Sequence, residues 1–242
     1  MESGECMEAV AELKRFGVVL LRGLVSADTV QSLRSAAVAC FEAIESSGTA
    51  PERYRFNRFS NSVLATALLD YRVSGVEDLI APAVLAGMEL VAPEILGCSA
   101  AWSREQSWVR KKHPPMPGRP AYYQPHSWHQ DGALGVRFPL SPSPVGPMTL
   151  LVTCWLALDA CGRDAPGLEF LRRPVEDLLH FTKLNDAELR RRVGAADLWV
   201  PELVAGDMLV FSNGTLHRTF ETAAMTQSRL SIEYRWMAAP RG

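Results

Sequence analysis

Two histidines and one aspartate have the residue types and spacing that suit a metal ion. His129 and Asp131 are separated by one residue in SWHQDGALG, and His217 lies far downstream in AGDMLVFSNGTLHRTFE. Side chains two positions apart in an extended strand point to the same face, so His129 and Asp131 can reach one ion, whereas Gln130 faces the other way. Two imidazoles and one carboxylate form the facial arrangement typical of non-haem Fe(II), which leaves three positions open for chemistry.

A second group of residues strengthens this interpretation, because a His-any-Asp pattern also arises by chance as a polar corner of a surface strand. Arg229 lies on the next expected strand, RLSIEYRWM, and Ser231 faces the same way two residues later. A guanidinium binds a carboxylate in bidentate fashion, and a neighbouring hydroxyl adds one more hydrogen bond. These two residues predict a site for a dicarboxylate whose other end reaches the metal.

The elements that position these residues begin with a mostly helical flank that contains one strand. Residues 7–16 favour a short helix, and GVVLLRGLV (17–25) favours a buried strand. Ser26 is a suitable N-cap for a helix that Gly48 and Pro51 end. The apolar positions of that helix recur with helical period, at Val30, Leu33, Ala37, Phe41 and Ile44.

A second helical region is expected at residues 64–69 and 76–95. Pro82 and Pro93 should break it, because proline lacks a backbone donor, and Gly97 should end it. The polar and aromatic stretch RYRFNRFSN (53–61) before it is either a loop or an edge of the binding cavity.

From about Trp102 onward the pattern changes to short β runs. SWVRKK, MTLLVTCWLALD, DLWVPELV, DMLVF and RLSIEYRWM are separated by Gly, Pro, Asp and Asn, which predicts an antiparallel architecture. A polar insert at 174–192 contains the helix-like NDAELRRRV, and PLSPSPVGP (139–147) is expected to be a loop beside the site. Residues 1–242 should form a single domain, with the helical flank at 1–100 and the β core at 101–242.

The composition restricts the partners and the compartment. The chain has 25 Lys and Arg against 27 Asp and Glu, a net charge of −2, and only short runs of like charge, so neither a nucleic-acid nor a membrane partner is expected. The amino terminus is acidic where a signal peptide is basic, and the apolar runs are too short to span a membrane. Five cysteines without a CxxC pair fit reduced thiols, and Cys154 is expected in the core. We expect a soluble, cytoplasmic protein.

Several segments together resemble the phytanoyl-CoA dioxygenase family of Fe(II)/2-oxoglutarate-dependent oxygenases. The resemblance rests on WHQD (128–131), AGDMLVFSNGTLH (205–217) and RLS (229–231). The opening LKRFGVVLLRGLVSADTVQSLR is similar to the usual amino terminus of the family, and VTCWLALD followed by GLEFLRRP is similar to its strand, loop and Gly-x-Leu segment. These segments follow the family order over most of the chain.

The resemblance implies a fold and a set of site residues. The fold would be mainly β with flanking helices around a double-stranded β-helix, a cupin-like jelly roll. His129, Asp131 and His217 would bind iron, and Arg229 with Ser231 would hold the distal carboxylate of 2-oxoglutarate. Three further residues either line the co-substrate pocket or are ordinary strand residues: Lys112, Trp155 and Gln124. The chain departs from the family in one place, where Arg172, Arg173, Pro174 and Val175 replace the usual Pro-Gly-Ser-His.

The implied reaction consumes 2-oxoglutarate and O₂, releases succinate and CO₂, and oxidises a substrate C–H bond, with hydroxylation favoured. Asp131 argues against halogenation, because related halogenases carry a small residue there; desaturation, ring formation and epimerisation stay open. Candidate substrate-lining residues are Arg58, Asn57, Tyr123, Arg137, Phe138 and Asn213, with the loop 139–147 as a lid. Two arginines suit an acidic or amino-acid-like small molecule, such as a specialised-metabolite intermediate, better than a CoA ester.

Two other classes of function remain open from the sequence. One is a metal-dependent isomerase, epimerase or hydrolase on a similar barrel, in which substrate binds the metal directly and 2-oxoglutarate is not used. The other is a non-catalytic jelly-roll binding module, since fold does not fix function. Arg229 and Ser231 count against the first, and the complete triad counts against the second. The sequence does not determine the oligomeric state.

Overall fold

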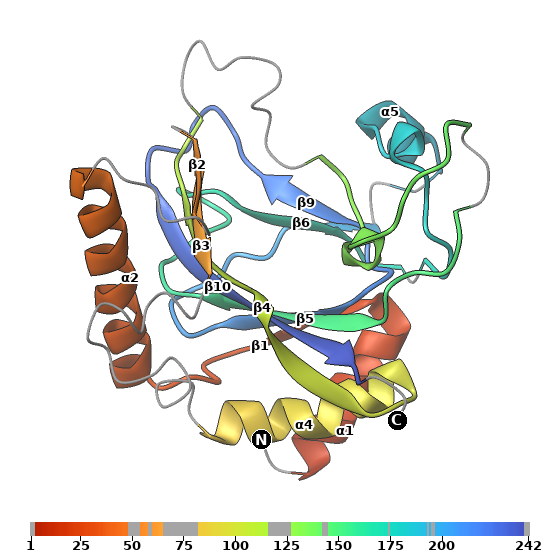
Figure 1. Cartoon of the computed structure of the whole chain (residues 1–242), viewed down its shortest axis with the longest axis horizontal. Coiled ribbons are helices and arrows are strands. Elements are labelled where there is room, and N and C mark those ends of the chain that lie inside the picture. The colour runs from red at the N-terminus through yellow and green to blue at the C-terminus, as the bar shows by residue number, and fades with distance from the viewer. Residues whose placement is uncertain are drawn as a thin grey trace.

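Two antiparallel sheets form the centre of the fold (Figure 1). The computed structural model describes residues 3–47, 54–57, 60–64, 82–115, 127–141, 145–173, 175–192, 194 and 197–239. The larger sheet contains, in order, β1 (Val18–Leu21), β8 (Met208–Ser212), β5 (Leu151–Ala157), β10 (Arg229–Ala238), β4 (Ala100–Lys112), β3 (Ser60–Leu64) and β2 (Tyr54–Asn57). The smaller sheet contains β7 (Leu198–Trp199), β6 (Gly167–Leu171) and β9 (His217–Phe220). The expected jelly-roll core with flanking helices is confirmed.

Three of the described helices pack on the side of the larger sheet that faces away from the smaller one. Figure 1 shows α1 (Ser3–Phe16) and α4 (Pro82–Leu96) against this side, with β6 and β9 beyond the opposite face. The helix α2 (Ala27–Ser47) contributes to the same apolar cluster, and its five expected apolar positions are all buried there. The Ser26 hydroxyl accepts a hydrogen bond from the Thr29 backbone N–H at 3.3 Å, as expected of an N-cap.

The strand β5 separates two apolar clusters because all seven of its residues are buried. Val152, Cys154 and Leu156 join the cluster under the helices, whereas Trp155 and Ala157 join the cluster between the two sheets. This alternation follows from the period of two in a strand. It places Thr153 and Trp155 on the side of β5 that faces the candidate site.

The amino-terminal flank contains more strand than we predicted. Residues 54–57 and 60–61 of the stretch that was expected to be a loop or a cavity edge lie in β2 and β3, which pair with each other and extend the larger sheet beside β4. Pro93 lies inside α4 and does not break it, whereas Pro82 is its first residue, where a missing N–H costs nothing. Gly97 ends α4 with a positive φ of 65°, as expected. Residues 65–81 lie outside the described part.

The later elements follow the predicted pattern. All five β runs after Trp102 form strands, and every pairing between the described strands is antiparallel. The polar insert contains the short helix α5 (Asp186–Arg192). All five cysteines are free, and burial raises the pKa of the Cys154 thiol well above its usual range, which confirms Cys154 as a core residue.

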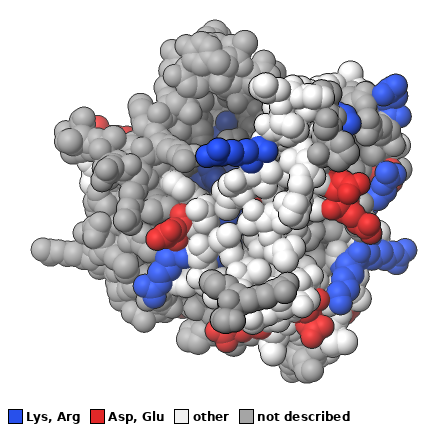
Figure 2. All heavy atoms as spheres, turned by 45° about the vertical axis from the view of Figure 1, so that its right-hand side comes forward, with Lys and Arg blue, Asp and Glu red and all other residues white. Residues whose placement is uncertain are grey.

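On the face drawn in Figure 2, the basic and acidic side chains of the described residues are interspersed and do not form one extended patch of a single sign. Within the described ranges, no helix combines the length and the apolar character that a membrane crossing needs.

Candidate functional site

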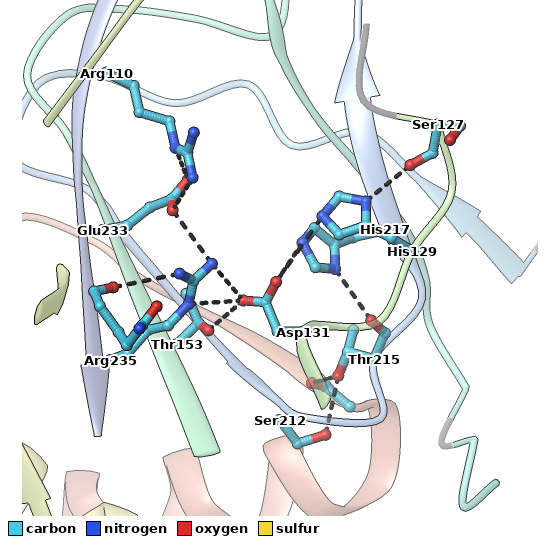
Figure 3. A network of polar contacts seen from close by, with 12 residues as sticks. Arg110, Ser127, His129, Asp131, Thr153, Ser212, Thr215, His217, Glu233 and Arg235 are labelled. Atoms are coloured by element: carbon cyan, nitrogen blue, oxygen red, sulfur yellow. Dashed lines mark hydrogen bonds and ion pairs between the residues drawn. The ribbon is translucent and has the colours of Figure 1, made fainter. Parts of the chain in front are cut away.

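His129, Asp131 and His217 come together at one end of the space between the sheets (Figure 3). The backbones of His129 and His217 form an antiparallel bridge, with N–H to carbonyl distances of 2.9 and 3.1 Å. The Nε2 atoms of His129 and His217 lie 3.9 and 3.8 Å from Asp131 Oδ1, and one ligand atom from each residue lies within 4.8 Å of the others. One ion can therefore contact all three side chains.

Backbone carbonyls fix the orientation of both imidazoles. Nδ1 of His129 lies 2.8 Å from the Ser127 carbonyl oxygen, and Nδ1 of His217 lies 3.0 Å from that of Thr215. A carbonyl oxygen only accepts, so each Nδ1 carries the hydrogen and each Nε2 presents its lone pair toward Asp131. Burial and the neighbouring His129 lower the pKa of His217 to about 4, which keeps its ring neutral near pH 7.

Asp131 reaches the site from a tight turn, not from an extended strand as we predicted. It begins a 3-10 turn at Asp131–Ala133, in which the Gly132 N–H donates to the Asn213 carbonyl at 2.9 Å. Oδ2 accepts hydrogen bonds from Thr153 and Arg235, so Oδ1 is the oxygen that faces the imidazoles. Burial opposes ionisation, but Arg235 and both imidazoles outweigh it and hold the pKa of Asp131 well below its usual range.

Gln130 points away from the metal ligands, as the sequence indicated. Its buried side chain donates to the carbonyls of Asp177 and Gly214 at 3.0 and 3.1 Å and accepts from the Leu179 N–H at 2.8 Å. The residue between the two ligands therefore joins their segment to the polar insert.

Arg229 and Trp155 line the same cavity, and the buried Ser231 lies behind Arg229 and is not among the described residues of the lining. The Arg229 side chain is buried, donates from Nε to the Pro166 carbonyl at 2.8 Å, and donates from Nη1 to the Ser231 hydroxyl. Its guanidinium carbon lies 4.7 Å from the centre of the Trp155 ring. Burial lowers the pKa of Arg229 to about 10, so it stays charged at neutral pH. A fixed cation beside a hydroxyl suits a carboxylate.

The cavity has a volume of about 260 Å³, and its lining includes residues that sequence reasoning missed. Those with polar groups are Gln106, Trp108, Arg110, Glu233, Arg235 and Thr219; the apolar ones are Leu134, Leu168 and Phe211. The alternation of side chains between the two faces of β10 could have identified two of these residues. If Arg229 and Ser231 face the cavity, Glu233 and Arg235 do so as well.

Several expected pocket residues lie elsewhere or outside the described residues. Lys112 is buried, with Nζ 3.8 Å from Glu221 Oε2, and is not among the described residues that line the cavity. Arg137 is exposed, and Phe138 packs edge-on against His180 and Phe181. Outside the described residues lie Gln124, Arg58, Tyr123, the side chain of Asn57 and positions 142–144 of the expected lid loop. Asn213 contacts the site through its carbonyl.

The donor set fits a mononuclear iron centre of the facial type, with a carboxylate clamp nearby. The chain belongs to the phytanoyl-CoA dioxygenase family, because the sequence model of that family, Phytanoyl-CoA dioxygenase (PhyH), matches residues 13–226. The protein is therefore an enzyme of the class that depends on iron and 2-oxoglutarate, and these two are its cofactors. Among curated protein sequences, none matches the chain.

Solved structures with the same fold have low sequence identity to this chain. EctD from S. alaskensis with bound Fe superposes with a TM-score of 0.68 at 18% identity, covering 98% of this chain and 77% of that one. The epimerase SnoN in complex with Fe3+, alpha ketoglutarate and nogalamycin RO gives 0.64 at 17% identity, covering 98% and 85%. AviO1 from Streptomyces viridochromogenes Tue57 gives 0.62 at 18% identity, covering 98% and 97%. At sequence identities this low, the similarity to these structures shows a shared fold only.

Proposed function

We propose that this chain is a dioxygenase that hydroxylates a small molecule, an amino acid or a specialised-metabolite intermediate, with release of succinate and CO₂. The observation that carries the proposal is the position of Asp131 Oδ1 opposite the Nε2 atoms of both histidines, in the cavity that Arg229 also lines. A retained carboxylate ligand favours oxygen insertion over halogen transfer.

One group of residues would bind the metal, and another would bind the co-substrate. His129, Asp131 and His217 would hold iron on one face, which leaves the opposite face open. Bound iron would supply activation of O₂ and oxidation of the substrate C–H bond. Arg229 and Ser231 would orient 2-oxoglutarate by its distal carboxylate. The Trp155 Nε1 atom is buried and has no hydrogen-bond partner among the described residues, so it offers a further donor.

The cavity supports a small and partly polar substrate. Its volume of about 260 Å³ must accommodate 2-oxoglutarate as well. Gln106 and Arg110 give its wall polar groups, and Leu134 adds an apolar contact close to the metal ligands. Substrate contacts with Arg58, Asn57 and Tyr123 stay part of the proposal, whereas Arg137, Phe138 and Asn213 are not among the described residues that line the cavity. A nucleic-acid or membrane partner is not proposed.

The direct test is anaerobic addition of Fe(II) and then 2-oxoglutarate to the metal-free protein. A weak visible charge-transfer band is expected, and it should be lost in His217→Ala and Asp131→Ala. Absence of the band from unmodified protein that demonstrably binds iron would contradict the proposal. Screening a metabolite library for substrate-dependent succinate formation would then identify the substrate.

Epimerisation is the second candidate, because SnoN, one of the solved structures with this fold, is an alpha ketoglutarate dependent epimerase. The two outcomes differ in the composition of the product. Hydroxylation adds an oxygen atom to the substrate, whereas epimerisation leaves its composition unchanged. Mass spectrometry of the product, with a chiral separation, distinguishes them.

A further inference from the structure

Arg235 lies on the side of Asp131 that faces away from the two histidines (Figure 3). Its Nε and Nη2 atoms lie 3.3 and 3.2 Å from Asp131 Oδ2, and the Thr153 hydroxyl donates to the same oxygen at 2.6 Å. We propose that Arg235 is a positioning residue that makes Asp131 a one-oxygen ligand of iron. The inference rests on the proposed function only in taking iron as the bound ion.

The hydrogen bonds at Asp131 separate the roles of its two oxygens. A carboxylate oxygen offers about two lone-pair sites. Three donors from Arg235 and Thr153 surround Oδ2, whereas Oδ1 faces the imidazole Nε2 atoms. Binding through Oδ1 alone would leave open positions on iron for 2-oxoglutarate and O₂. If both oxygens bound iron, one of these positions would be lost.

The sheet places both donors in register. Arg235 on β10 is paired directly with Thr153 on β5. Side chains at such paired positions project from the same face of a sheet, so the guanidinium and the hydroxyl approach Asp131 together. Both donors therefore come from paired strands of the larger sheet.

An irregularity in β4 supports Arg235 from the other side. Glu233 pairs with Trp108, but Arg235 pairs with Ser103 where a regular ladder would give Gln106. The extra residues bring the Gln106 carbonyl to 3.3 Å from Arg235 Nη1, and the Ser107 hydroxyl accepts from the Arg235 backbone N–H at 3.4 Å. Bulges of this kind commonly re-aim a side chain near an active site.

A partly buried acid, Glu233, completes the support of the guanidinium. Glu233 Oε2 lies 3.5 Å from Arg235 Nη2, and Arg110 holds Glu233 with two hydrogen bonds of 2.6 and 2.8 Å. The charges therefore alternate from Arg110 through Glu233 and Arg235 to Asp131. Every nitrogen of the Arg235 guanidinium has an acceptor, which restricts its rotation and hence that of the Asp131 carboxylate.

The test compares metal binding in Arg235→Met, Arg235→Lys and Thr153→Val with the unmodified protein. Arg104→Met serves as the control, because Arg104 is an exposed arginine of β4 that stacks on Trp102. Each protein is prepared metal-free, checked for folding by circular dichroism, and titrated anaerobically with Fe(II). Excess 2-oxoglutarate is then added, and the visible charge-transfer band is recorded.

We expect Arg235→Met to weaken Fe(II) binding by about 10- to 100-fold, as loss of a residue that orients a metal ligand commonly does, and to shift the charge-transfer band. Arg235→Lys should restore part of the affinity, Thr153→Val should weaken binding less, and Arg104→Met should match the unmodified protein. Unchanged affinity and band position in folded Arg235→Met would overturn the inference. If that variant does not fold, unchanged values in both Arg235→Lys and Thr153→Val would overturn it. A missing band in the unmodified protein would instead contradict the proposed function.

Discussion

The side-chain amide of Gln130 donates a hydrogen bond of 3.1 Å to the backbone carbonyl of Gly214. Gln130 stands between the ligands His129 and Asp131, and Gly214 lies three residues before His217 in the chain. The contact therefore ties together the two segments that bring all three ligands. The same side chain also bonds the backbone at Asp177 and Leu179, so the polar insert is part of this junction.

Replacement of Gln130 by Leu should weaken both the fold and the metal site. The change leaves the Leu179 N–H and two carbonyls without their partner in a buried place, which costs about 1 to 3 kcal/mol for each unsatisfied group. We expect lower unfolding free energy in urea and weaker Fe(II) binding. Gln31→Leu on the exposed side of α2 is the matched control. Stability and affinity equal to those of the control would contradict this role.

Gly214 should tolerate no side chain. A Cβ at this position would lie 2.2 Å from the Val175 carbonyl oxygen, so the insert or the turn before His217 would have to move. Gly214→Ala should lose about 1 to 3 kcal/mol of unfolding free energy, as overpacking commonly does, and should bind Fe(II) more weakly. Gly146→Ala is the control, since no atom lies within 4 Å of its Cβ position. Equal denaturation midpoints for both variants would show that the turn adapts freely.

The sequence predicted the helix α2 and the five β runs after Trp102 because each has a local signature. Helical and strand periods depend on neighbouring residues, as in α2, whose apolar positions all proved buried. The turn at Asp131 has no such signature, because a carbonyl from the distant Asn213 fixes it. The irregularity in β4 likewise depends on pairing with β10. The alternation that places Arg229 and Ser231 on one face of β10 also places Glu233 and Arg235 there, so the sequence could have predicted both residues.

Replacement of Arg229 by Gln should act on the co-substrate and spare the metal. Removing one partner of a buried charge pair costs about 2 to 5 kcal/mol, so 2-oxoglutarate should bind at least about thirtyfold more weakly. Fe(II) affinity should stay unchanged, because no bond from Arg229 to a metal ligand is found among the described residues. Titration of the charge-transfer band with 2-oxoglutarate measures the first quantity, and direct Fe(II) titration measures the second. Loss of iron binding in folded Arg229→Gln would show that the roles are wrongly assigned.

Glu233 should give the protein a share of stability that acid removes. Burial opposes its ionisation, but Arg110 and Arg235 outweigh burial and lower the pKa of Glu233 to about 2, from a usual value of 4.5. Because the pKa is lower in the folded state, ionised Glu233 stabilises the fold above about pH 4.5, and this contribution disappears as the pH falls toward 2. On acidification the unfolded chain takes up the proton at a higher pH than the folded chain does, so the free energy of unfolding falls.

We therefore expect Glu233→Gln to be less stable than the unmodified protein at pH 7 by up to about 3 kcal/mol, since the change breaks a partly buried ion pair. The difference in unfolding free energy should shrink steadily between pH 5 and pH 3, as ionised Glu233 becomes less favourable in the unmodified protein. Urea titrations at a series of pH values measure it, and Glu105→Gln at an exposed position of β4 is the control. Asp131 titrates in both proteins, so its contribution largely cancels in the difference. A difference that stays constant on acidification would show that Glu233 is not held ionised by Arg110 and Arg235.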